Sequence, residues 1–494
     1  MQTHHFVSLE TAYGSVTLFT SLLHNIFLLY HVDIFVSVYK IDKSSFWLGE
    51  TIFLVWNSMN DPLFGWFSDK KFLNPSLSKN NNSSNIVWTR LTALHIYGPL
   101  FACAFSLFWI NWTWPGLQFA VCLCLYDGFL TMIDLHHSAL LADLSVSANL
   151  RTRLNARSSL FSAFGSVSVF LSYMVWNKSD LFTFRCFCYG LATLSFLGYL
   201  TMVRVLKTSF VKFLKDSNPD IEVSDLAIES GVDPSSKASV LKFGKQLLSH
   251  KNFLWFAFLN FVQVFHCHFN SNFFPLFLDT LLGDTVSPAV ASCLLGISFV
   301  APHINNLYFL KLCEKHGIYS VIRTLFIVKL CISLLMYGIG SQQIWLLCIF
   351  IASNRVFTEG TCKLLSLVIS DLVDEDVVLH SRPQAVSALV FGTAALVSKP
   401  GQTLAPVIGT WVLKLQTGHD IFRTGEESGS IKLDLSRMDA QTRDAYRNGV
   451  FLMLIFVPVV CASFQLLAWS CFTLRDQRLS KVKAARAGLM HVDI

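Results

Sequence analysis

Hydrophobic residues occur along most of the chain in runs of about twenty, and short polar segments separate these runs. A helix needs about twenty consecutive apolar residues to cross the roughly 30 Å of hydrocarbon in a bilayer. The pattern therefore predicts an all-α integral membrane protein with twelve transmembrane helices. We place them at residues 12–39, 46–68, 91–111, 117–141, 158–176, 183–204, 252–279, 288–310, 319–339, 345–372, 384–415 and 448–472.

A long polar stretch from Lys207 to Lys251 divides the predicted helices into two sets of six. It contains two segments rich in turn-forming residues, 216–220 and 233–237, which indicate a solvated linker. We therefore predict an N-terminal half at 1–204, a cytoplasmic linker loop at 205–251, a C-terminal half at 252–474 and a basic tail at 475–494. Two six-helix halves joined by a long loop are typical of major facilitator transporters.

The composition supports a membrane environment, since 53% of the residues are hydrophobic and only 14% are charged. Soluble domains carry about a quarter charged residues. The net charge of +6 does not indicate nucleic-acid binding, because the basic residues lie between the apolar runs and not on one polar face. Most of the thirteen cysteines lie inside the runs, and we interpret them as reduced, small apolar side chains.

The distribution of Lys and Arg favours cytoplasmic termini, because most of them then fall on the inner side. In this orientation the sequons at Asn111 and Asn177 are extracellular glycosylation candidates, whereas those at Asn81 and Asn82 fall in an inner loop and conflict with it. The first ten residues contain no Lys or Arg and no cleavage pattern, so we expect no removable signal peptide. We expect a multi-pass protein of the plasma membrane.

Polar residues gather on one face of the second predicted helix. Asn57, Asn60 and Asp61 follow the spacing i, i+3 and i+4, which places them together on a helix surface. Ionisable groups at membrane depth are costly to bury, so Asp61 is a candidate for function. The alternative is that such groups satisfy one another as interhelical hydrogen bonds, which we favour for an isolated Asn or Ser.

The fourth predicted helix has a similar polar face, made by Asp127, Thr131, Asp134 and Ser138. We expect Asp134 to be buried in the middle of its span. Carboxylate, amide and hydroxyl oxygens are hard ligands suited to a small cation such as Na⁺, and a carboxylate can also carry a proton. Beside this face, His136 and His137 could take up protons or simply form hydrogen bonds.

Basic residues also occur inside predicted helices of the second half. Lys399 lies within the eleventh run, where an ammonium needs a carboxylate partner; it could face a central cavity or form a static ion pair. Arg355, Glu359 and Lys363 follow the spacing i, i+4 and i+8, so they could pair along their own helix.

The seventh predicted helix contains His266, Cys267 and His268 in succession. Adjacent helical residues point about 100° apart and cannot all bind one ion, so we do not interpret them as a metal site. His266 with Asn270 forms an i, i+4 pair that could line a cavity or bond a neighbouring helix, and His268 with Asn272 forms another.

An acidic cluster at residues 371–376 ends the tenth helix, and we expect it to be solvated near Arg382. The sequence has no phosphate-binding glycine loop, zinc-finger spacing or nucleophile elbow. We therefore expect neither an enzyme nor a resident cofactor or metal beyond a coupling Na⁺ or H⁺. The expected partners are the lipid bilayer and a small-molecule solute, and not nucleic acid.

Several short motifs resemble the glycoside–pentoside–hexuronide cation symporters, the family of melibiose permease. They are Ala12-Tyr13-Gly14, the stretch from Trp56 to Trp66 with Asn60-Asp61-Pro62, the stretch Thr131-Met132-Ile133-Asp134, the acidic residues Asp371 and Asp374, and Lys399. The resemblance thus covers both halves. The stretches 60–66, 265–272 and 353–361 are also similar to a narrower group of major facilitator domain proteins.

The resemblance implies a cation site made by the second and fourth helices, with an essential lysine nearby. It assigns the cation to Asn57, Asn60, Asp61, Thr131 and Asp134, and charge balance to Lys399. The departures are Asn57 in place of a carboxylate, Ser21 in place of a sugar-binding Asp, and Ser138 in place of a Trp that stacks on the sugar. The expected solute path is lined by Ser21, Asp127, His137, Ser138, His266 and Asn270.

The sequence therefore predicts a cation-coupled symporter, driven by Na⁺ or H⁺, that moves a small polar solute by alternating access. The alternative is a transporter-like receptor or scaffold without transport activity. The departures at Ser21 and Ser138 favour the alternative, whereas Asp61, Asp134 and Lys399 favour transport, because buried charges are costly in a protein that binds no cation.

Overall fold

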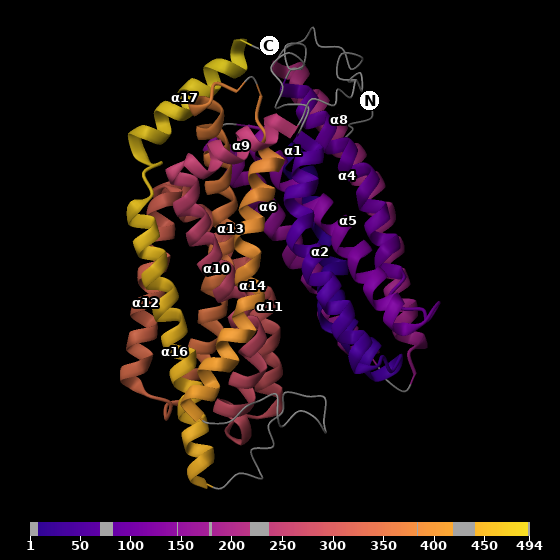
Figure 1. Cartoon of the computed structure of the whole chain (residues 1–494), viewed down its shortest axis with the longest axis vertical. Helices are drawn as coiled ribbons and strands as arrows, with labels where there is room; N and C mark the ends of the chain where they lie inside the picture. The colour runs from indigo at the N-terminus through magenta and orange to yellow at the C-terminus, as the bar shows by residue number, and fades with distance from the viewer. Residues whose placement is uncertain are drawn as a thin grey trace, which may run out of the picture. The chain divides into compact units, whose positions relative to one another are not determined.

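The computed structural model describes residues 8–69, 83–145, 147–176, 180–217, 237–382, 384–417 and 440–492. These residues are almost entirely helical and contain no β-strand (Figure 1). By its internal contacts the chain divides into two compact units. Unit 1 comprises Met1–Ser249, Ser366–Leu396 and Leu474–Ile494, and unit 2 comprises His250–Leu365 and Val397–Thr473.

Unit 1 contains the helices from the first half of the chain, the last helix, and parts of two others. The complete helices are α1 (Leu9–Asp33), the π-helix η1 (Ile34–Val38), α2 (Lys43–Asp69), α4 (Ser83–Ser106), α5 (Pro115–Asp143), α6 (Ala148–Ser166), α7 (Ser168–Val175), α8 (Phe182–Ser217), α9 (Lys237–Ser249) and α17 (Asp476–Val492). Helix α1 packs on α6 and α8, while α5 packs on α2 and α4. The end of α13 (Ile344–Leu379) and the start of α14 (Ser387–Thr417) complete the unit.

Unit 2 contains α10 (Lys251–Phe277), the π-helix η4 (Leu278–Leu282), the 3-10 helix η5 (Gly283–Thr285), α11 (Pro288–His316), α12 (Ile318–Ile339) and α16 (Ala440–Cys471), with most of α13 and α14. Helix α16 packs on both α10 and α12. A core of aromatic and aliphatic side chains fills the contact between α10 and α16; it includes Phe269, Phe273, Tyr446 and Phe451.

Every stretch that we predicted as a membrane span is helical over most of its length, although residues 107–111 and 384–386 lie outside the helices. Five helices of the described part are long and apolar enough to cross a membrane by length and composition alone, namely those at Leu9–His31, Pro115–Asp143, Phe182–Lys215, Ile318–Ile339 and Arg443–Cys471. Polar residues in the middle of other helices, such as Asn60 and Asp61 in α2, lower their hydropathy. The count of twelve crossings therefore stays a prediction, as does the division into two six-helix halves.

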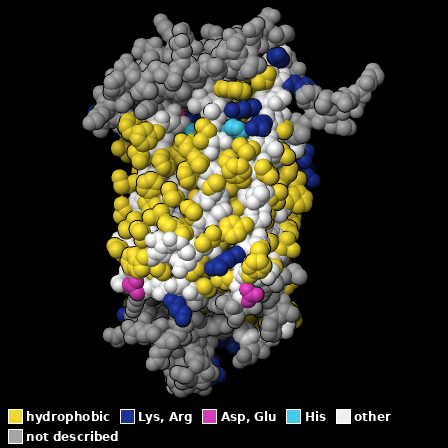
Figure 2. Space-filling model, turned by 90° about the vertical axis from the view of Figure 1, so that its right-hand side faces the viewer, with side chains coloured by type: hydrophobic (Ala, Val, Ile, Leu, Met, Phe, Trp, Pro, Cys, Tyr) yellow, Lys and Arg dark blue, Asp and Glu magenta, His cyan; other side chains and the backbone are white. Residues whose placement is uncertain are grey.

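The exposed surface of the helices is largely apolar. Leu194 and Leu197 of α8 and Trp345 and Ile349 of α13 expose more than half of their surface. Figure 2 shows one face on which hydrophobic side chains cover most of the described surface and charged side chains are few. Such a surface is stable only against lipid, which fits the predicted membrane environment.

Two glycines allow close contact between α2 and α14 within unit 1. A Cβ atom on Gly65 would lie 2.7 Å from the backbone oxygen of Ala388, and one on Gly392 would lie 2.5 Å from the backbone oxygen of Asp61. Any larger side chain would force these helices apart, since interiors are close-packed. The two glycines therefore fix the backbone of α2 at its acidic residue.

Candidate cation site and buried polar networks

A polar group joins α2 to α5 in unit 1. The side-chain amide of Asn60 donates hydrogen bonds to the Asp127 carboxylate and, at 3.2 Å, to the Thr131 hydroxyl. Asn60 is fully buried and Thr131 nearly so, while Asp127 is partly exposed. The two polar faces seen in the sequence thus meet through Asn60. Asp127, which we expected in the solute path, lies in this group.

Asp61 follows Asn60 on α2 and is also buried, with 8% of its surface exposed. Its backbone oxygen faces Gly392 of α14, as described above. Asn57, one turn earlier, is partly buried. Carboxylate, amide and hydroxyl oxygens therefore gather along one stretch of α2 and α5, which is the donor set that a small hard cation or a proton requires.

The expectation that Asp134 is buried is wrong, because its side chain is exposed although Thr131, one turn earlier on α5, is buried. Helical spacing predicts which residues share a face, but it does not predict how much of that face a neighbouring helix covers. Burial thus distinguishes Asp61 from Asp134.

His137 joins α1 to α5. Its ring stacks on that of Tyr13 with centroids 4.0 Å apart, and its Nε2 lies 3.1 Å from the Tyr13 carbonyl oxygen. The Tyr13 hydroxyl in turn donates to the His137 carbonyl oxygen at 2.9 Å. Of the two roles that we left open for this histidine, the hydrogen-bonding one is therefore observed. Its neighbour His136 is also buried.

The two serines that depart from the sugar-symporter pattern lie on different helices of unit 1. Ser21 of α1 packs against α6, where a Cβ atom on Gly165 would lie 2.7 Å from the Ser21 Cβ. Ser138 of α5 is partly buried. A carboxylate at position 21 would need space beside the α6 backbone that the serine now fills.

Unit 2 contains a second buried polar network, around Lys329 of α12. The Lys329 ammonium donates to Gln465 Oε1 at 2.6 Å and lies 3.2 Å from His266 Nδ1. Gln465 donates to Gln263, and Asn270 donates to the Thr358 hydroxyl at 3.4 Å. His266 and Asn270 therefore bond neighbouring helices, one of the two roles we expected for them; their place in a solute path stays a prediction.

Lys329, Gln263 and Gln465 are residues that we did not single out in the sequence. Lys329 could have been found, because a lysine in the middle of an apolar run is costly and so rarely incidental. The glutamines carried no such signal, since only packing makes them neighbours. Lys399 of α14 is partly buried in unit 2, and its predicted pairing with carboxylates stays a prediction.

The three charged residues in the middle of α13, Arg355, Glu359 and Lys363, do not form the series of pairs that their spacing suggested. The Arg355 guanidinium lies over the Phe274 ring, 5.3 Å from its centroid. Among the described residues, Glu359 forms no ion pair with Arg355 or Lys363, although both influence it electrostatically. The suggested pairing of Glu359 along its helix is therefore not observed.

The acidic cluster at the end of α13 is not solvated, and that expectation is wrong. Each of its four carboxylate residues, Asp371, Asp374, Glu375 and Asp376, exposes 3% or less of its surface. Arg151 of α6 contacts both oxygens of Asp374, at 2.8 and 3.1 Å, and reaches Asp371 at 3.3 Å. Buried carboxylates need such partners because desolvation is costly.

The basic tail supplies the remaining cations, because it forms helix α17 beside this cluster. Lys483 lies 2.9 Å from Asp371, and Arg478 lies 2.6 Å from Glu375. Arg382 pairs with Asp376, as its proximity in the sequence suggested. Distant segments with opposite charge thus bury four carboxylates together, which no local pattern could reveal.

Two further ion pairs, which we did not predict, link the ends of α2, α4 and α5 through Arg90. Arg90 is fully buried; it lies 2.7 Å from Asp69 and 3.2 Å from Asp143. Asp69 also accepts the Leu389 backbone N–H at 2.9 Å, in the first turn of α14. A carboxylate at a helix N-terminus is stabilised by the unpaired amides and the helix dipole.

Of the glycosylation candidates, Asn111 is exposed in the connection between α4 and α5. Asn177 and the conflicting sequons at Asn81 and Asn82 lie outside the described residues.

Comparisons with known proteins identify the family. Residues 12–433 match the family model described as MFS/sugar transport protein. The chain is 55% identical to "Transmembrane protein 180" of Gallus gallus over 97% of its own length and 95% of the relative's. It is 53% identical to the protein of that name from Mus musculus, over 98% and 96% of the two chains.

Solved structures agree with this family at the level of the fold. An outward-facing bacterial homologue of the iron transporter ferroportin superposes with a TM-score of 0.59 at 12% identity, covering 95% of this chain and all of that one. The fucose:proton symporter of E. coli gives 0.54 at 12% identity, covering 94% and 98%. The chain is therefore a multi-pass membrane protein that belongs to the MFS/sugar transport protein family.

Proposed function

We propose that this protein is a cation-coupled symporter that moves a small polar solute by alternating access. The observation that carries the proposal is the buried group in which Asn60 of α2 bonds Asp127 and Thr131 of α5, beside the buried Asp61. A buried carboxylate at membrane depth is costly and marks a candidate site for a cation or a proton. The coupling ion is Na⁺ or H⁺, because the donors are oxygens and carry no softer ligand.

In this mechanism the cation neutralises the carboxylates and stabilises the conformation in which α2 and α5 stay bonded. Release of the cation leaves like charges in a medium of low dielectric constant, which destabilises that conformation. A ligand that binds one conformation more tightly shifts the equilibrium toward it. Asp61 and Asp127 hold the cation, Asn60 and Thr131 position it, and Lys399 balances the charge when it leaves.

The supporting residues extend our original assignment. Asn57 contributes an amide oxygen from the preceding turn of α2, and the exposed Asp134 attracts the cation from water toward the buried group. His137 holds α1 against α5 through its contacts with Tyr13. Ser21, Ser138, His266 and Asn270 are proposed to face the solute.

The test is the melting temperature of the purified protein in detergent, measured in Na⁺ or choline at matched ionic strength and at two pH values. A cation that binds only the folded state raises stability by mass action, so we expect a rise of roughly 2–5 °C in Na⁺ or at the lower pH. Asp61→Asn and Asp127→Asn should abolish it. The control, Asp444→Asn, changes the charge equally at an exposed position of α16 and should keep the rise.

The competing function is a receptor or scaffold with a transporter fold, and the close packing of Ser21 against α6 favours it. A wild-type melting temperature that does not change with the cation or the pH would support this alternative and contradict the cation site. A rise that survives in both carboxylate variants would contradict the assignment of the site to α2 and α5.

Orientation and location belong to the same proposal: cytoplasmic termini, in the plasma membrane. Support comes from the distribution of basic residues and the exposed sequon at Asn111. A C-terminal epitope that antibody reaches only after permeabilisation of intact cells agrees with this orientation. Staining without permeabilisation contradicts it.

A further inference from the structure

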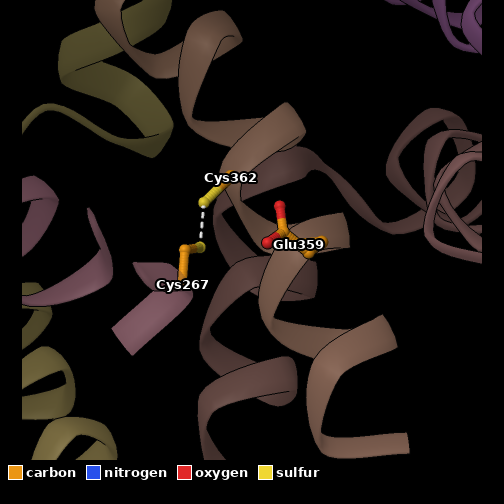
Figure 3. A group of neighbouring side chains, drawn as sticks. All are labelled: Cys267, Glu359 and Cys362. Atoms are coloured by element: carbon orange, nitrogen blue, oxygen red, sulfur yellow. Dashed lines mark hydrogen bonds between the residues drawn. The ribbon is translucent and has the colours of Figure 1, made fainter. Parts of the chain in front are cut away.

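A cluster of metal-binding side chains lies in unit 2, and it shares no residue with the proposed cation site. Cys267 of α10 meets Glu359 and Cys362 of α13, and the ligand atoms of all three lie within 4.8 Å of one another (Figure 3). The two sulfur atoms are 2.7 Å apart. Glu359 and Cys362 are three residues apart, so one face of α13 presents both.

The carboxylate of Glu359 is available to a ligand. Among the described residues it accepts no hydrogen bond and forms no ion pair, although its side chain is only partly exposed. Figure 3 shows its carboxylate on the same side of α13 as the Cys362 sulfur. A partly buried carboxylate is stabilised by a cation or by a hydrogen-bond donor.

The side-chain amide of Gln263 contacts both sulfurs. Gln263 directs its amide nitrogen to Cys362 Sγ at 3.3 Å and to Cys267 Sγ at 3.6 Å. Gln263 accepts from Gln465, which accepts from the Lys329 ammonium at 2.6 Å. The shortest contact of the Gln263 amide nitrogen, at 2.7 Å, is to the Thr358 carbonyl oxygen. Its two contacts with sulfur are of the kind that stabilises a metal-bound thiolate.

Lys329 also supplies the charge that such a site needs. The lysine is buried and, among the described residues, forms no ion pair with a carboxylate. It lies close enough to Cys267 and Cys362 to interact with both electrostatically. Two thiolates, one carboxylate and a divalent ion have a net charge of −1, which the ammonium balances.

We propose that Cys267, Cys362 and Glu359 bind one divalent metal ion of borderline softness, with Zn²⁺ as the reference ion. Sulfur ligands select such ions over Na⁺ or Mg²⁺, which prefer oxygen. Binding forms two metal–sulfur bonds and one metal–oxygen bond and releases two thiol protons to solvent. In a tetrahedral site with zinc–sulfur bonds of about 2.3 Å, the two sulfurs lie roughly 3.8 Å apart. Metal binding therefore increases the distance between them by about 1 Å.

The experiment titrates the purified full-length protein with Co²⁺ in detergent under reducing conditions, since cobalt reports zinc sites by its absorption. We expect thiolate-to-cobalt charge-transfer bands that saturate at one ion per chain and vanish when Zn²⁺ is added. Cys267→Ser and Cys362→Ser should abolish the bands, and Glu359→Gln should weaken binding at least ~10-fold. Cys348→Ser, a buried cysteine earlier on α13, is the matched control and should bind as the wild type does.

A measurement on the wild type keeps the test independent of how the variants fold. Zn²⁺ should slow alkylation of Cys267 and Cys362, detected by peptide mass, without protecting the exposed Cys103. Absence of charge-transfer bands in the wild type, or their persistence in both cysteine variants, overturns the site. A disulfide between Cys267 and Cys362 in protein trapped at lysis also overturns it, because the pair would then be a redox couple.

Discussion

The two units stabilise buried charge in different ways. In unit 1, Arg151 faces Asp371 and Asp374 across short ion pairs, and α17 adds further cations. In unit 2, the hydrogen bonds of the buried Lys329 within the described part of the chain go to neutral groups, Gln465 and His266. In the network of unit 1 the opposite charges balance one another, and the ion pairs hold the helices together. In the network of unit 2 the charge of Lys329 is not balanced by a carboxylate among the described residues, so an anionic ligand could balance it.

The largest expected effect comes from breaking the complete network. Arg151→Ala leaves Asp374 buried without its main partner and removes one of the cations at Asp371. The loss costs about 3–5 kcal/mol of unfolding free energy. We expect a large fall in melting temperature or loss of folded protein on size-exclusion chromatography. The comparison fails if Arg151→Ala melts within a degree or so of the wild type.

Arg153 provides the control on the same helix. It pairs with Glu10 at 2.8 Å, but its side chain is 64% exposed. Solvent-exposed pairs contribute about 0–1 kcal/mol, so Arg153→Ala should change the melting temperature little. The contrast between two arginines two residues apart isolates burial from charge.

A smaller effect is expected from the incomplete network. Lys329→Met removes the ammonium and leaves acceptors on Gln465 and His266 unsatisfied, at a cost of about 1–3 kcal/mol. No carboxylate loses its partner, so metal-free Lys329→Met should melt above Arg151→Ala. Thermal unfolding of both proteins in one detergent provides the measurement, with Lys311→Met at an exposed position of α11 as control. A Lys329→Met protein less stable than Arg151→Ala would reverse the ranking of the two networks.

The smallest effect concerns a carboxylate that is fully solvated. Asp42 precedes α2 and accepts hydrogen bonds from the Ser44 hydroxyl and, at 2.9 Å, from the Ser45 backbone N–H. These bonds lower the pKa of Asp42 from 3.8 to about 2. Because the folded-state pKa is depressed, the stabilisation is complete above the unfolded value and is lost as pH falls toward the folded value.

Asp42→Ala should therefore be slightly less stable than wild type at pH 6, with the difference shrinking as the pH falls from 5 to 3. Melting curves of the two proteins along this pH series test the prediction. A difference that is constant with pH would show that the hydrogen bonds, and not the charge, stabilise the start of α2.

Much of the secondary structure could be predicted from the sequence, because apolar runs of membrane length form helices whatever their neighbours are. Helical spacing also placed Asn60, Asp61 and Thr131 on polar faces of α2 and α5. Spacing could not predict that Asp134 is exposed, since exposure depends on the packing of other helices. Nor could it predict that the acidic end of α13 is buried, because its partners lie in α6 and α17.

The candidate metal site shows the same limit. In the sequence, the nearest possible ligands beside Cys267 are His266 and His268, and helical geometry prevents these three residues from binding one ion together. Its partners in the structure are Glu359 and Cys362, almost a hundred residues away. Similarly, the position of Lys329 in an apolar run could have marked it as a costly residue, whereas nothing in the sequence points to the glutamines that bond it.

By itself, therefore, the sequence determined the membrane environment, the helical stretches, the resemblance to cation symporters and the residues whose burial is costly. These follow from local hydropathy and spacing, which act within a single helix. Only the tertiary structure decided which costly groups meet, which are solvated and which share a hydrogen-bond network. Those outcomes depend on contacts between residues far apart in the chain, where the energy of a charge is set by its surroundings.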